Sequence, residues 1–162
     1  MGAPREEFAD AVAFYVKVIG EIEPDQWALP ARGTLTVLEV GVEGSRPLST
    51  VRDFLAAGAE EEEIFETVGY YVRNKPVDAE TAEGHERRGR EALERFQSGD
   101  PAAVVTRLAE QALAGVNSAP DDALVGTQFG GMRLMRYLPT RTMELVARHR
   151  GCRRDWFPDC SC

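Results

Sequence analysis

Glu144 is the residue whose type and surroundings most strongly suggest chemistry. It is the only acid in residues 124–149 and has apolar neighbours on both sides. A carboxylate in such a setting is either solvated on the outer face of a helix or held inside by a cation or a metal ion. Arg148, four residues later, can form an ion pair in the favoured order, acid first. Glu144 and Arg148 are therefore the candidate catalytic residues, and an inward Glu144 is expected to be neutralised by Arg148 or Arg141. The alternative, that both face water, stays open.

His149 and three cysteines are the other potential metal ligands near the end of the chain. His149 lies about 140° round a helix from Glu144, so only a π-bulge would bring both to one ion. Cys152, Cys160 and Cys162 follow in a C-x7-C-x-C spacing that matches no common zinc motif. We therefore expect these cysteines to be poorly packed and to share no metal. Their odd number does not indicate a secreted disulfide framework.

The residues around Glu144 also carry a resemblance to a known family. The run MRLMRYLPTRTMELV, residues 132–146, resembles the closing segment of the mycothiol-dependent maleylpyruvate isomerase family, which belongs to the DinB-like metal-binding four-helix bundles. The positions that match are Gly131, Met132, Arg133, Leu134, Tyr137, Leu138, Thr140, Arg141, Glu144 and Leu145. Weaker likeness covers the N-terminal helix, residues 27–30 and residues 89–96, so most of the chain is included.

The resemblance implies a divalent metal, usually zinc, held by one histidine on the second helix and a Glu-x-x-x-His pair on the last. Mycothiol would supply a thiolate that the metal activates, and the reaction would be a thiol-dependent isomerisation or S-transfer on a small electrophile. Glu144 keeps its ligand position, but the family's final histidine is Arg148 here. Arginine stays protonated and cannot ligate a metal.

Two alignments compete for the first histidine position. Distance from the Trp27 turn favours the TVLE string at residues 36–39, which places Glu43 there. Identity of the motif favours the TVRD string at residues 50–53, which places Ala57 there. Neither is a histidine, so the metal site is degenerate. The alternative function is a non-catalytic bundle that has lost the metal and serves as a binding or interaction module.

Composition sets broader limits on the function. The chain has 162 residues, 43% hydrophobic residues and a net charge of −8. That charge argues against nucleic acid as the main partner, because phosphate binding needs a basic surface. No apolar run approaches the roughly 20 residues that span a membrane. The N-terminus turns acidic at once, unlike a secretory signal. We expect a cytoplasmic protein, monomeric or homodimeric, with a small-molecule thiol and an electrophile as partners if it is an enzyme.

Apolar spacing predicts an all-α fold of four principal helices that position these residues. The segments with a helical pattern are residues 4–22, a segment that begins at Pro47 and Ser49, residues 78–97, a segment that begins at Pro101, and residues 140–149 after a break at Pro139. Residues 34–42 suggest one short extra strand or helix. The acidic run at 60–63 is expected to be a solvated helix start, and His85 a surface residue.

The predicted DinB-like bundle domain covers residues 1–150 and is followed by a cysteine-containing tail, 151–162. After about Val146 the sequence departs from the family pattern, so truncation or a shifted reading frame remains an open alternative. Residues at intervals of three and four along the predicted helices should be buried together: Phe8, Val12, Val51, Leu55, Val105, Leu108 and Leu145.

Overall fold

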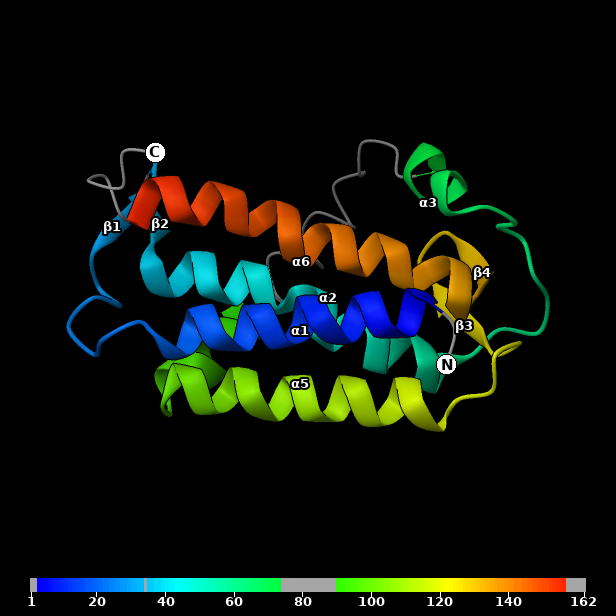
Figure 1. Cartoon of the computed structure of the whole chain (residues 1–162), viewed down its shortest axis with the longest axis horizontal. Coiled ribbons are helices and arrows are strands. Elements are labelled where there is room, and N and C mark those ends of the chain that lie inside the picture. The colour runs from blue at the N-terminus through cyan, green and yellow to red at the C-terminus, as the bar shows by residue number, and fades with distance from the viewer. Residues whose placement is uncertain (1–2, 34, 74–89, 157–162) are drawn as a thin grey trace.

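Four long helices dominate the part of the chain that the computed structural model describes. It describes the backbone of residues 3–33, 35–73 and 90–156, and in the last helix the side chains as far as Ala147. The helices are α1 (Ala3–Gly20), α2 (Val37–Ala57), α5 (Pro101–Ser118) and α6 (Leu134–Trp156). α1 and α6 run in one direction, and α2 and α5 run in the opposite direction (Figure 1). α1 packs on α5 and α6, and α2 packs on the same two helices. The mainly helical fold is therefore confirmed.

The core lies between these four helices, where the sequence placed it. Six of the seven residues predicted to be buried together are at most 5% exposed, and Leu55 packs against them. Full burial of a large apolar side chain contributes about 1.5–3 kcal/mol. α1 and α5 keep close to their predicted bounds. α5 begins as expected, with Asp100 capping the amides of Ala102 and Ala103 ahead of Pro101 at the first helical position.

α2 begins about three turns earlier than predicted. The side chain of Thr36 accepts from the amide of Glu39, and the Glu39 carboxylate accepts from the amide of Thr36, which is a capping box. Pro47 lies inside this helix and is not its entry. The extra strand suggested at 34–42 is only β2 (Leu35–Thr36), which pairs with β1 (Pro30–Arg32). The predicted start of α2 was wrong because proline is common in the first turn of a helix. Here Pro47 lies within the helix, and its lack of a backbone N–H is compensated by packing.

The acidic run after α2 is not a helix start. Residues 60–63 are irregular, and the next helix is α3 (Thr67–Arg73). Glu62 pairs with the side chains of Arg133 and Arg136, and Glu63 accepts from the amide of Gly131. The predicted helix start is therefore wrong, whereas Glu60, Glu61 and Glu63 are exposed as expected. Glu62 and Glu63 bind this segment to α6 and to a neighbouring hairpin.

That hairpin consists of β3 (Leu124–Thr127) and β4 (Gly130–Arg133). α6 follows it directly, so the predicted helix start after Pro139 is also wrong. Pro139 is the sixth residue of α6. The residues around it explain why the helix continues: Leu134, Tyr137 and Leu138 are fully buried.

Several predictions fall wholly or partly outside the described residues. The helix expected at 78–97 is seen only as a helical segment over residues 90–97, and His85 is not described. The backbone of α6 continues past residue 150 to Trp156, across the expected boundary of the tail. The side chains of Arg148, His149 and Cys152 lie outside the described part, as do Cys160 and Cys162. None of the described helices is both long enough and apolar enough to cross a membrane.

Candidate functional site

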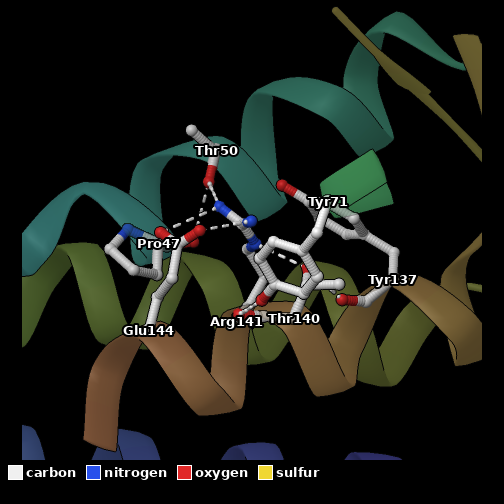
Figure 2. A network of polar contacts seen from close by, with 7 residues as sticks. All are labelled: Pro47, Thr50, Tyr71, Tyr137, Thr140, Arg141 and Glu144. Carbon is white, nitrogen blue, oxygen red and sulfur yellow. Dashed lines mark hydrogen bonds and ion pairs between the residues drawn. The ribbon is translucent and has the colours of Figure 1, made fainter. Parts of the chain in front are cut away.

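Arg141 on α6 is the centre of a polar network in which α2, α3 and α6 meet. Its side chain is only 3% exposed. Its Nη2 donates to Glu144 Oε1 at 2.7 Å, and its Nη1 donates to Glu144 Oε2 at 3.3 Å. Nε donates to Thr140 Oγ1 at 2.9 Å, and Nη1 also reaches Thr50 Oγ1 on α2 at 3.4 Å (Figure 2). A buried guanidinium is costly unless it is paired, and the two-point contact with Glu144 supplies that pairing.

Two tyrosine rings cover the same guanidinium. Its central carbon lies 5.0 Å from the ring centre of Tyr70 and 4.8 Å from that of Tyr137. The negative faces of aromatic rings attract a cation at these distances. The two rings also meet edge to face, with centres 5.6 Å apart. We call Thr50, Tyr70, Tyr71, Tyr137, Thr140, Arg141 and Glu144 the Arg141 cluster.

α3 brings Tyr70 and Tyr71 to this cluster. It packs on α6, and the hydroxyl of Tyr71 donates to the carbonyl of Thr140 at 3.2 Å. Thr67 donates to the carbonyl of Arg136 at 2.9 Å. Arg73 donates to the carbonyls of Phe129 and Glu63. These bonds hold a helix of seven residues over the start of α6, with Tyr70 as its buried residue.

The electrostatics of the cluster keep its tyrosines neutral and its arginine charged. Burial raises the pKa of Tyr137 strongly and also raises the pKa of Tyr70 and Tyr71. Burial acts to lower the pKa of Arg141, but its interactions with Tyr137 and Glu144 outweigh that effect and raise it. At neutral pH the phenols can therefore donate or accept hydrogen bonds, but they do not act as bases.

One hydroxyl of the cluster is left without a partner. Tyr137 is fully buried, yet its hydroxyl makes no hydrogen bond with any described residue. Thr50 approaches closely enough to oppose the effect of burial on the pKa of Tyr137, but the contact lacks ordinary hydrogen-bond geometry. A buried polar group left unsatisfied costs about 1–3 kcal/mol. Tyr137 thus offers a donor that the described fold does not use.

Some of the predicted site residues lie in the Arg141 cluster and others lie outside it. Glu144 lies beside α2, with its side chain 23% exposed, and Arg141 provides the expected compensation. Glu43 pairs with Arg32 at 2.5 Å on the surface, and Ala57 is the exposed last residue of α2. The α2 residues drawn with the cluster are Pro47 and Thr50 (Figure 2). Neither alignment of the first histidine position therefore puts its residue in this network.

Metal-ligating side chains do not gather in the described part of the chain. No three histidine, cysteine, aspartate or glutamate side chains there are placed to share an ion. A surface groove of about 400 Å³ lies elsewhere, between α1 and α6, and has an apolar lining that includes Met143 and Val146. Neither Arg141 nor Glu144 lines it.

Sequence reasoning missed the aromatic part of the cluster. Tyr70 and Tyr71 precede Arg141 by about seventy residues, and nothing in their spacing links them to it. The adjacent pair of tyrosines was the available signal, since their hydroxyls need partners when buried.

Comparisons of the chain with protein-family models, curated proteins and solved structures found no match.

Proposed function

We propose that this chain is a metal-independent binding module: a DinB-like helical bundle, similar to the mycothiol-dependent maleylpyruvate isomerase family, whose cationic centre is Arg141. The observation that carries the proposal is the Arg141–Glu144 contact. The carboxylate at the family's ligand position is held at two points by a buried guanidinium. The Arg141 guanidinium is therefore the cation that lies beside the Glu144 carboxylate.

The ligand count supports this function over zinc-dependent catalysis. A catalytic zinc normally takes three protein ligands. Of the family's three positions, only Glu144 keeps the residue of the family, and α2 presents Pro47 and Thr50 to it (Figure 2). The resembled motif also contains an arginine at position 141, and the loss of both family histidines adds to the support that the Arg141–Glu144 pair gives.

The chemistry of the cluster also favours binding over catalysis. General bases and nucleophiles work best with a pKa near the working pH. The phenols of the cluster have raised pKa values, and its remaining groups are threonine hydroxyls and the Arg141–Glu144 ion pair. What the cluster offers to a small molecule is a guanidinium edge, hydroxyl donors and aromatic faces. These groups recognise ligands, and the isomerase or S-transferase implied by the resemblance would need groups that they do not supply.

Zinc stoichiometry of designed variants tests the proposal. We expect the wild-type protein, produced with zinc present, to contain far less than one zinc per chain by elemental analysis. Thr50→His combined with Arg148→His should raise uptake, because residue 50 lies at the cluster. Ala57→His combined with Arg148→His is the matched control and should not, because residue 57 lies about 10 Å further along α2. Stoichiometric zinc in the wild-type protein, with loss on Glu144→Gln, would overturn the proposal.

A further inference from the structure

The Arg141 cluster already holds a carboxylate, and that carboxylate belongs to the protein. Glu144 accepts from both terminal nitrogens of Arg141, and this two-point contact suits a carboxylate. The cluster therefore shows, through its own side chain, which chemical group it accepts. A free carboxylate in the same place would make the same two contacts.

Glu144 can leave this position more easily than Arg141 can. Both of its hydrogen bonds with described residues go to Arg141, and its side chain is 23% exposed. Rotation of Glu144 toward water would leave the buried guanidinium unpaired, so Glu144 leaves this position readily only when the carboxylate of a ligand takes its place. Arg141 is fixed in addition by Thr140, by Thr50 and by two aromatic rings. If the carboxylate of a ligand replaced that of Glu144, the Arg141 guanidinium would therefore keep its position.

The unused hydroxyl of Tyr137 is an independent sign of a missing partner. It is fully buried beside Arg141, and no described residue accepts from it. Its pKa is raised by burial first and also by Glu144, which places the phenol within the field of that carboxylate. A ligand oxygen bound by Arg141 would give this donor an acceptor that the protein alone does not.

We propose that Arg141 binds a small monocarboxylate in exchange for Glu144, with Tyr137 and Thr50 as additional hydrogen-bonding groups. This inference rests on the proposed binding function. The ligand's tail would fill the space that the Glu144 side chain vacates, so its size is that of propionate. A single guanidinium edge matches a planar monoanion better than a phosphate dianion, and the net charge of −8 further disfavours the dianion.

The test is a titration of the isotopically labelled protein with sodium propionate, followed by NMR, with sodium chloride at equal ionic strength as the reference. Saturable shifts of the Thr50 and Tyr70 amides are expected in the wild-type protein. Glu144→Gln keeps the shape of the side chain and removes its competing charge, so affinity should rise by about five- to tenfold. Arg141→Lys should abolish saturation, and Tyr137→Phe should weaken binding several-fold.

The control is Asp53→Asn, which removes a carboxylate from an exposed pair with Arg52 on α2. Its affinity should equal that of the wild type. No saturable shift in either the wild type or Glu144→Gln would overturn the inference, as would binding that Arg141→Lys leaves intact. A low zinc content together with absent propionate binding would refute only this inference. Stoichiometric zinc at Glu144 would refute the proposed function as well.

Discussion

At the scale of single residues, the buried hydroxyls of the Arg141 cluster show how stability and binding can conflict. The hydroxyl of Tyr71 is satisfied by the carbonyl of Thr140, whereas the hydroxyl of Tyr137 has no partner among the described residues. A satisfied hydrogen bond stabilises a protein by about 0.5–1.5 kcal/mol, and an unsatisfied buried group destabilises it. A ligand oxygen bound by Arg141, as proposed above, would give the Tyr137 hydroxyl the partner that the described residues do not supply.

Replacing each tyrosine by phenylalanine tests this difference. Tyr137→Phe should raise the free energy of unfolding by up to about 1 kcal/mol, because it removes an unsatisfied hydroxyl and keeps the ring over Arg141. Tyr71→Phe should lower it by about 1 kcal/mol, because the carbonyl of Thr140 loses a donor. Urea unfolding of both variants measures the two effects. A clear loss of stability in Tyr137→Phe would mean that its hydroxyl has a structural partner.

At the scale of elements, short polar signals decide where α2 begins and how the hairpin packs. The capping box sets the start of α2, although Pro47, nearly three turns later, has the pattern of a helix start. Glycines allow β3 and β4 to approach the chain that follows α2. A Cβ on Gly131 would lie 2.0 Å from the carbonyl oxygen of Glu61, and a Cβ on Gly126 would lie 2.0 Å from that of Gly58. Position 131 therefore requires glycine for close approach and not for backbone freedom.

The capping box should make stability depend on pH. The pKa of Glu39 is lowered, first by its hydrogen bond from the Thr36 backbone and then by the Thr36 side chain. A carboxyl group with a lowered folded pKa adds stability above its unfolded pKa, about 4.3, and loses it as pH falls through the folded value. Glu39→Gln should thus be less stable than the wild type at pH 7, with the gap closing in acid. Thr36→Ala should cost about 1 kcal/mol, and Thr36→Ser much less. Calorimetry across pH checks this, and a gap that stays constant in acid would contradict it.

The hairpin contact predicts a large effect at one glycine and none at another. Gly131→Ala should lower the free energy of unfolding by several kcal/mol, because backbone would have to move away from the new Cβ. Gly20→Ala is the matched control, since nothing lies within 4 Å of a Cβ at the last residue of α1. That variant should be neutral or slightly stabilising. Equal unfolding midpoints for the two variants would show that the hairpin is not packed as described.

At the scale of the whole molecule, four helices bury one continuous core, and the polar cluster lies at the junction of α2, α3 and α6. Apolar contacts between the helices supply the bulk of the stability, and the cluster adds a buried charge that is paired within the protein. Because the helices themselves form this core, we expect the bundle to fold without a metal ion, whereas folding depends on the metal in domains built around structural zinc.

Thermal unfolding with and without a chelator tests this independence. A ligand that binds only the folded state stabilises it by about 2.7 kcal/mol at a hundredfold excess over its Kd. We expect the Tm of the wild-type protein to be the same in EDTA as in buffer, and zinc to leave it unchanged. Thr50→His with Arg148→His serves as the positive control, with a Tm that rises in zinc. A fall in the wild-type Tm on chelation would contradict a metal-independent fold.

The sequence by itself determined the helical fold and most of its core. Phe8 and Val12 on α1, and Val105 and Leu108 on α5, follow the period of a helix, and that period depends only on local geometry. It also singled out Glu144 and named Arg141 as one source of its neutralisation, because residues three or four apart on a helix share a face.

Only the tertiary structure decided how Arg141 is enclosed and why α2 and α6 continue through Pro47 and Pro139. Tyr70 and Thr50 reach Arg141 from other helices, and contacts between distant residues leave no periodic trace in a sequence. Pro47 and Pro139 read locally as helix starts, yet both lie inside helices whose neighbouring residues are buried. Burial of those residues outweighs the loss of one backbone hydrogen bond, and that balance depends on what packs against them.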